Sequence, residues 1–294
     1  MIDSTVDGFF NFINLRHRIY LKKRAGNPWP WTRNRILQAY RFTNVYRDLD
    51  AVSVDLKHAV LADYQPWRKD DAAELFGEVI TYRLFNWPAT YELLRRLRGD
   101  RWDEAEAKRT LRTAQSRGAK IFTGAYIVSN NASTRPKIDL YCEAVTEARE
   151  LSKPLVRLIR ADRTLENATA VIAEHVPMCG SFVAYEIVSD LRWTPLLSTA
   201  PDIMTWANPG PGATRGLNRI HGRPLKSKPP RSQLVQEMRE LLRESRRPDR
   251  LADHMRPLEM RDVEHSLCEV DKYLRVKNGE GKPRARYWPP PCSA

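Results

Sequence analysis

The stretch VPMCGSFVAYEIVSDLRWT, residues 176–194, is typical of a helix, a tight hairpin and a second helix. Val176 and Pro177 are expected to end the first helix, because proline cannot donate the next backbone hydrogen bond. Gly180 can adopt a positive φ angle, and Ser181 is a favoured N-cap residue for the helix that follows. A hairpin of this kind points unpaired N–H groups outward, so it predicts a binding site for phosphate.

Helical spacing of apolar residues extends from this hairpin over most of the chain and predicts an all-α protein. The ambiguous residues 118–130 are assigned to a helix only because their surroundings are helical. One expected helix, from 34 to beyond 42, would place Arg41, Asn44 and Arg47 near one face. The expected helices cover residues 3–25, 34 to beyond 42, 46–62, 71–87, 89–98, 102–117, 118–130, 137–160, 164–175, 181–191, 232–246 and those from 261 onward.

The net charge of +13 is unevenly distributed along the chain. Residues 8–47 contain nine Lys or Arg and no acidic residue, and residues 203–236 contain six and again no acidic residue. Two such segments predict contacts with a phosphate backbone, with a merely solubilising surface as the alternative.

Composition excludes several other classes of protein. The 294 residues are enough for one large domain or two lobes. No apolar run approaches the roughly 20 residues that cross a bilayer, so no membrane association is expected. Cys142, Cys179, Cys268 and Cys292 are scattered and are expected to be reduced thiols, and the six histidines follow no metal-binding pattern.

A glycine-rich string, NPGPGATRGLN, occupies residues 208–218 and predicts an irregular loop up to about Gly212. Glycines such as Gly210 let backbone N–H groups approach a phosphate, because no side chain blocks them. Arg215 and Asn218 are then expected one helical turn apart. No GKS or GKT follows the string, so it does not predict the ATP-binding Walker A loop.

The hairpin resembles the helix-hairpin-helix of the DNA glycosylase superfamily, in which a catalytic aspartate follows the second hairpin glycine. The resemblance assigns Gly180 to that glycine and Asp202 to the aspartate, with Asp190 as a second candidate acid. Phe182 stands where bifunctional glycosylases carry a lysine nucleophile, which argues against Schiff-base chemistry. The structural alternative is that Asp202 only caps the short segment that follows it.

A closer resemblance is to the phage-type thymine-hypermodification proteins, the α-glutamyl/putrescinyl-thymine pyrophosphorylases or amino acid:DNA transferases. These are a branch of the glycosylase superfamily. The blocks that carry the resemblance are PWPWTRNRILQAYRFTNVYRDLD (28–50), GSFVAYEIVSDLRWT (180–194), GPGATRGLNRI (210–220) and EHSLCEVDKYLR…GEGKPRARY (264–287). It implies a transferase that replaces the pyrophosphate of 5-(pyrophosphoryloxymethyl)uracil in DNA with an amine.

The resemblance also implies a two-lobed, helix-hairpin-helix DNA glycosylase-like fold. Residues 1–225 would form the helical core, with the hairpin near 176–192. Residues 226–294 would add C-terminal helices that pack back on the N-terminal lobe, followed by a basic tail. In such a fold the target nucleotide is expected to be flipped out of the duplex.

Three groups of site residues follow from the residue types and the resemblance. Asp202 and Asp190 would be the catalytic carboxylates, which accept a proton from the incoming ammonium group. Arginine guanidinium groups would hold the pyrophosphate, because each can bind two oxygens at once. For Glu269 and Lys272, on the last helix, the alternative is an ordinary surface salt bridge. Expected pyrophosphate or substrate contacts are Arg41, Asn44, Arg47, Gly210, Gly212, Arg215, Asn218, Glu269 and Lys272. Expected DNA contacts are Met178, Cys179, Gly180, Ser181, Arg33, Arg35 and Arg219.

The expected partners are double-stranded DNA that carries modified thymine, and an amino acid or polyamine as the amine co-substrate. No cofactor, metal or iron–sulfur cluster is expected. The protein is expected to be a monomer in the cytoplasm of a phage-infected cell. Two other functions remain open at this point: a DNA glycosylase or lesion enzyme of the same fold, and a non-catalytic DNA-binding helical protein.

Overall fold

The computed structural model describes residues 2–65, 67–68, 71–97, 102–124, 129–130, 132–283 and 285–289. Within these residues the regular structure is helical, apart from one isolated β-bridge between Tyr40 and Arg286, so the all-α prediction is confirmed. The chain divides into unit 1, Met1–Asp50 with Ile203–Ala294, and unit 2, Ala51–Asp202. The domain boundary predicted at 225/226 falls inside unit 1. No described helix combines the length and the hydropathy needed to cross a bilayer.

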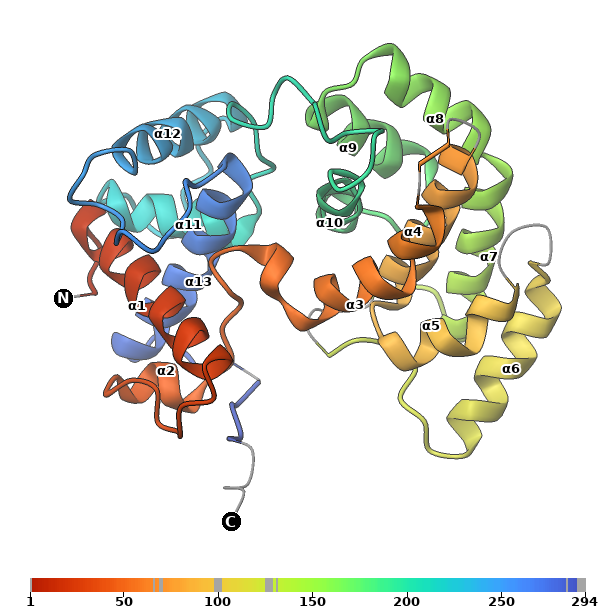
Figure 1. Cartoon of the computed structure of the whole chain (residues 1–294), viewed down its shortest axis with the longest axis horizontal. Helices are drawn as coiled ribbons and strands as arrows, with labels where there is room; N and C mark the ends of the chain where they lie inside the picture. The colour runs from red at the N-terminus through yellow and green to blue at the C-terminus, as the bar shows by residue number, and fades with distance from the viewer. Residues whose placement is uncertain are drawn as a thin grey trace. The chain divides into compact units, whose positions relative to one another are not determined.

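Unit 1 is built around its last helix, α13, which contacts the four other α-helices of the unit (Figure 1). Phe9, Phe12 and Ile13 recur at helical spacing on α1 and are buried, and the Phe12 ring lies 6.0 Å from that of Tyr273 on α13. The helices of unit 1 are α1 (Val6–Arg24), α2 (Arg35–Ala39), the 3₁₀ turn η1 (Arg47–Leu49), α11 (Pro211–Ile220), α12 (Arg231–Glu244) and α13 (Met260–Lys277).

Unit 2 is built around α4, which contacts α5, α7, α8 and α10 (Figure 1). All residues from Leu75 to Phe85 are buried, as expected of a helix surrounded by others. The helices of unit 2 are α3 (Ala51–Ala59), η2 (Leu61–Tyr64), α4 (Ala72–Phe85), α5 (Pro88–Leu94), η4 (Arg95–Leu97), α6 (Glu104–Ser116), α7 (Lys137–Glu150), α8 (Ser152–Ala161), α9 (Leu165–His175) and α10 (Ser181–Leu191).

The helix expected from residue 34 to beyond 42 is wrong in its second half. Asn34 caps α2, because its side chain accepts from the N–H groups of Ile36 and Leu37, but the helix ends at Ala39. The backbone is extended from Tyr40 onward. There it pairs with the C-terminal segment, through Arg41 N–H to Ala285 O (3.2 Å) and Tyr287 N–H to Ala39 O (3.0 Å). Arg41, Asn44 and Arg47 therefore do not share a helical face.

Three other helix predictions need correction. The helix expected over 46–62 is interrupted at Asp50, whose backbone is extended between η1 and α3. Gly118 has a φ of +87° just after α6, and the described residues of 118–130 are not helical. This segment lies on α4 and α5 instead: Phe122 stacks on Phe85 at 5.4 Å, and Thr90 Oγ1 donates to Ile121 O. Residues 125–128 lie outside the described part of the chain. The helix expected over 137–160 is interrupted at Leu151, where α7 ends and α8 begins.

The hairpin between α9 and α10 forms as predicted, but with a different backbone. The left-handed residue is Met178, with a φ of +63°, and Gly180 has an ordinary φ of −66°. Gly180 is the N-cap of α10, and Ser181 is its first helical residue. The positive φ predicted for Gly180 is thus found at Met178, and the N-cap role predicted for Ser181 is taken by Gly180. Between the helices, a turn is closed by the hydrogen bond from Cys179 N–H to Val176 O.

Candidate functional site

Two segments that the sequence singled out meet on α13 in unit 1, and a third pairs with one of them. Residues 40–50 approach the middle of the helix, residues 208–218 pack along it, and residues 285–287 pair with residues 39–41. The helix carries several buried polar side chains, some of which these segments contact. They are Arg261, Asp262, Glu264, His265, Ser266, Glu269 and Asp271.

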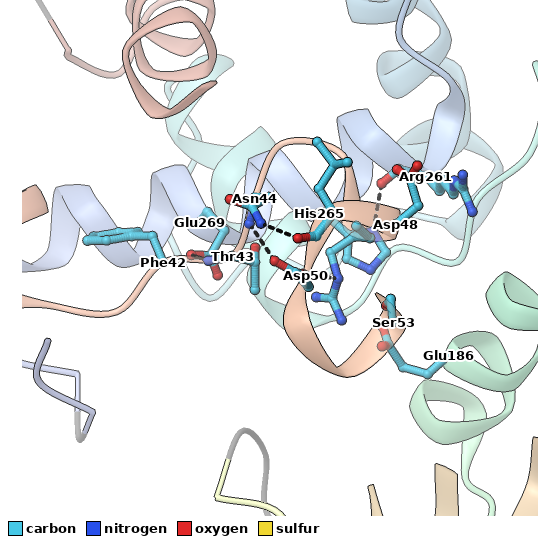
Figure 2. Close-up of polar contacts among 12 residues, drawn as sticks. Phe42, Thr43, Asn44, Asp48, Asp50, Ser53, Glu186, Arg261, His265 and Glu269 are labelled. Atoms are coloured by element: carbon cyan, nitrogen blue, oxygen red, sulfur yellow. Dashed lines mark hydrogen bonds and ion pairs between the residues drawn. The ribbon is translucent and has the colours of Figure 1, made fainter. Parts of the chain in front are cut away.

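Glu269 holds the 40–50 segment against α13. Its Oε2 atom accepts a hydrogen bond from Thr43 N–H at 3.0 Å and forms an ion pair with Lys272 Nζ at 2.7 Å. The same Lys272 ammonium lies 4.8 Å from the centre of the Phe42 ring, within range of a cation–π contact. Figure 2 shows Thr43, Asn44, Asp50 and Glu269 gathered where this segment passes the helix. The structure thus brings the predicted residues Asn44, Glu269 and Lys272 into one neighbourhood.

Arg16, on α1, fixes the same segment from its other side. Its guanidinium donates to the carbonyls of Phe42 and Thr43, each at 2.9 Å, and to Asn44 Oδ1 at 3.0 Å. Burial lowers the pKa of Arg16. The site prediction missed Arg16, although it lies in the acid-free basic segment, because nothing local marks an arginine that binds carbonyls 26 to 28 residues away.

Asp50 is the acid at the end of this segment, and the prediction missed it as well. Its Oδ1 accepts from Asn44 N–H at 2.9 Å, and its Oδ2 pairs with Arg47 Nε at 2.9 Å. Burial raises the pKa of Asp50, and Arg47 opposes the rise. A carboxylate with a raised pKa binds a proton more strongly than an ordinary one, which suits it to accept a proton from a hydroxyl group.

The glycine-rich segment touches α13 at two points. Gly210 N–H donates to Glu264 Oε1 at 3.2 Å, and Glu264 Oε2 lies 3.4 Å from His265 Nδ1. A Cβ atom on Gly212 would lie 2.0 Å from Cys268 Sγ, so glycine is required for α11 to pack this close. Gly210 and Gly212 therefore serve the contact with α13, and the helix begins at Pro211, slightly before the predicted end of the loop.

Asp271 is the centre of an arginine cluster on α11 and α13. Its carboxylate is 1% exposed and pairs with Arg215 at 2.8 Å, Arg219 at 3.0 Å and Arg275 at 3.7 Å. Arg219 also pairs with Glu280, and these bonds hold the pKa of Glu280 at about 2. Arg215 and Arg275 remain about one-third exposed. Arg219, predicted to contact DNA, is buried within the protein.

The remaining predicted residues are divided between exposed and interior positions. Asn218 is fully buried and donates to the carbonyls of Leu225 and Ser227, so it orders the following loop. Cys179 is buried as well. Arg33, Arg35 and Arg41 of unit 1 are exposed, as are Gly180 and Ser181 of unit 2.

The two predicted catalytic acids both make structural contacts inside unit 2. Asp202 accepts from the N–H groups of Leu165 (2.8 Å) and Glu166 (3.0 Å), and it thereby caps α9. Asp190 is fully buried, and its Oδ1 accepts from Arg83 Nη2 at 2.7 Å.

Comparison with known proteins gives the family. The family described as "5-hmdU DNA kinase, helical domain" matches residues 3–283. A "5-hmdU DNA kinase" of Bacillus phage SP10 is 27% identical over 226 residues, which cover 72% of this chain and 35% of that protein. The chain thus spans about a third of the length of the curated relative it matches. No solved structure matches.

These matches overturn the predicted function. The phage relative is named as a kinase of 5-hmdU DNA, not as a protein that replaces pyrophosphate with an amine or removes a base. The catalytic roles predicted for Asp202 and Asp190 in amine transfer are therefore no longer supported. The coarser resemblance, to phage proteins that act on a modified thymine in DNA, is confirmed. The match over residues 3–283 includes nearly all of both units, and the chain belongs to the family of 5-hmdU DNA kinase helical domains.

Proposed function

We propose that this chain is the DNA-handling part of a system that phosphorylates the hydroxymethyl group of 5-hydroxymethyl-deoxyuridine in DNA. The observation that carries the proposal is the family match over residues 3–283. In the reaction, the hydroxymethyl oxygen attacks the terminal phosphorus of a nucleoside triphosphate. A nucleoside diphosphate leaves, and the hydroxyl proton passes to a base.

The proposal assigns the DNA substrate to this chain and the phosphoryl donor to a separate nucleotide-binding domain or protein. Two facts support this division. The matched family is described as the helical domain of the kinases, and about two-thirds of the phage relative lies outside the matched region.

DNA is proposed to bind through exposed basic residues and through the hairpin of unit 2, in the manner of a helix-hairpin-helix protein. Arg33, Arg35 and Arg41 are exposed in a segment without acidic residues, which suits a phosphate backbone. At Gly180 a Cβ atom would meet nothing within 4 Å, so the backbone at the start of α10 is accessible to a phosphate.

Asp50 is proposed as the base that accepts the hydroxyl proton. Its carboxylate is 20% exposed on the side chain, and Asn44 and Arg47 orient it. Burial raises its pKa, which increases its affinity for the proton. Arg47, beside it, would offset negative charge on the transferring phosphoryl group.

The first test is binding. Fluorescence anisotropy with the full chain should show tighter binding to a duplex with one 5-hydroxymethyl-deoxyuridine than to the same duplex with thymidine. Affinity should fall steeply with salt, because phosphate contacts release counterions. Equal affinity for the two duplexes, or no binding at low salt, would contradict the proposal.

The second test is phosphoryl transfer. The same duplex is incubated with Mg²⁺, ATP, a nucleotide-binding kinase domain and the chain, and the nucleosides are analysed by mass spectrometry. Phosphorylated 5-hydroxymethyl-deoxyuridine should appear only when the chain is present. Asp50→Asn should slow this step by about 10²-fold or more at unchanged DNA affinity, as loss of a general base does. Asp249→Asn, an exposed acid whose side chain is 62% exposed, is the matched control.

A further inference from the structure

Unit 2 contains a pocket that lies outside the site described above. It has a volume of about 540 Å³ and is lined by residues before and at the start of α4, by residues at and just after the end of α8, and by the end of α10 with the turn that follows it. Figure 1 shows α4 and α8 side by side in this unit, and the two helices are in contact. The volume lies within the range of small-molecule sites, roughly 300–1,000 Å³.

The interior of the pocket is apolar. Leu75, Leu191 and Leu196 line it and are 4%, 1% and 7% exposed, so their side chains form a fixed wall. Trp67 lines the pocket as well and adds an aromatic surface. A flat apolar group fits this lining, because an indole ring and leucine side chains offer area for stacking.

Among the residues that the structure describes, the charged side chains that line the pocket are three arginines and one aspartate, Arg68, Arg160, Arg163 and Asp71. Asp71 pairs with Arg68 at 3.1 Å, which balances one positive charge. Arg163 donates to Leu196 O at 3.2 Å, Pro195 O at 2.6 Å and Thr199 Oγ1 at 3.4 Å. Carbonyl and hydroxyl oxygens hold this guanidinium in place without cancelling its charge. The described lining therefore combines a flat apolar surface with more arginines than acidic side chains.

We propose that this pocket binds a nucleotide, with the base against Trp67 and the leucines and the phosphate on Arg163 and Arg160. A phosphate group matches guanidinium forks, and a base matches the aromatic and aliphatic wall. The nucleotide comes either from a DNA strand or from a free nucleoside phosphate. The inference does not depend on the proposed function, because the pocket uses none of the residues assigned there.

The test measures binding of dTMP, ATP, thymidine and a single-stranded thymidine pentanucleotide to the full chain by calorimetry. Arg163→Ala and Arg160→Ala should each weaken dTMP and ATP binding by at least about tenfold, as loss of a charge-assisted hydrogen bond does, and leave thymidine affinity unchanged. Trp67→Ala should weaken all three small ligands, and Trp67→Phe should restore them. Arg157→Ala, an exposed arginine on α8 that does not line the pocket, is the control.

The pentanucleotide identifies the source of the nucleotide. If the pocket variants weaken its binding too, the pocket takes a nucleotide of DNA; if only dTMP and ATP binding fall, the pocket takes a free nucleotide. Either result supports the pocket. The proposal would be overturned if neither dTMP nor ATP binds at millimolar concentration. It would also be overturned if Arg163→Ala and Trp67→Ala both unfold at the temperature of the parent protein and both bind these ligands as the parent does. The proposed function is tested separately, by comparing the affinity of the chain for a duplex that contains 5-hydroxymethyl-deoxyuridine with its affinity for the same duplex that contains thymidine.

Discussion

Asp262 is a fully buried acid at the start of α13. Its Oδ2 accepts from Glu259 N–H at 2.9 Å, and its Oδ1 is buried without a hydrogen-bond partner among the described residues. Burial raises its pKa from 3.8 to about 6. The folded state therefore holds the proton more strongly than the unfolded state, and stability falls as pH rises from about 4 to about 6.

Asp262→Asn should remove this titration and keep the cap acceptor. We expect the variant to exceed the parent in unfolding free energy at pH 7, by roughly 3 kcal/mol at most, and the two to converge near pH 4. Urea denaturation of both proteins at four pH values between 4 and 7 measures the difference. A difference that does not change with pH would show that Asp262 does not titrate in this range.

Arg83 is a buried cation on α4. It is 3% exposed and contacts Asp190, Asn86 Oδ1 at 2.9 Å and Ser53 Oγ at 3.3 Å, with Glu186 at 3.9 Å. Arg83→Met should destabilise the protein by about 3–5 kcal/mol, because it removes the guanidinium that pairs with the buried carboxylate of Asp190. Thermal unfolding measures the loss. Adding Asp190→Leu should recover part of it, and a double variant as unstable as Arg83→Met would refute the pairing argument.

At the scale of elements, two glycines set how closely α11 packs on α13. A Cβ atom on Gly212 would lie 2.0 Å from Cys268 Sγ, and one on Gly216 would lie 2.6 Å from the backbone oxygen of Leu267. Gly212→Ala and Gly216→Ala should each destabilise the protein, by about 1–3 kcal/mol, through overpacking. Cys268→Ala should restore stability to Gly212→Ala, because it removes the Sγ atom that the new Cβ would meet. It should not restore stability to Gly216→Ala, whose new Cβ meets a backbone oxygen that no substitution removes.

Thermal unfolding followed by circular dichroism separates these variants. Gly180→Ala is the control, since its added Cβ meets nothing within 4 Å and its φ is −66°. If Cys268→Ala restored the stability of both glycine variants equally, the two added Cβ atoms would not act through separate contacts, and α11 would instead shift away from α13 as a rigid helix.

At the scale of the whole molecule, the two units differ in how the chain builds them. Unit 2 is one continuous segment, Ala51–Asp202, whereas unit 1 joins Met1–Asp50 with Ile203–Ala294. Residues 51–202 expressed alone should therefore fold cooperatively around α4. Residues 203–294 alone should not, because α13 then lacks α1 and the segment that donates to Glu269. Denaturant titrations of both fragments check this, and a non-cooperative transition for 51–202 would contradict it.

The sequence by itself determined the helical class, the position of most helices and the excess of positive charge. These features are local: apolar spacing reports the buried face of each helix, and caps such as Thr164 before α9 act within three residues. The sequence also singled out the segments that meet on α13. It placed the chain near phage proteins that act on modified thymine, but the amine transfer that it predicted is contradicted by the family match and by a relative named as a 5-hmdU DNA kinase.

The tertiary structure alone decided which polar side chains make hydrogen bonds and ion pairs within the protein and which are exposed to solvent. Thr43 meets Glu269 from 226 residues away, and this contact, with those of Arg16, holds residues 40–46 out of a helix. Asp202 caps a helix that begins 37 residues earlier, although it resembles a catalytic acid in sequence. An arginine or a carboxylate has the same local pattern whether its partner is a substrate or a buried ion, because hydrogen bonds between distant segments leave no periodic trace in the sequence.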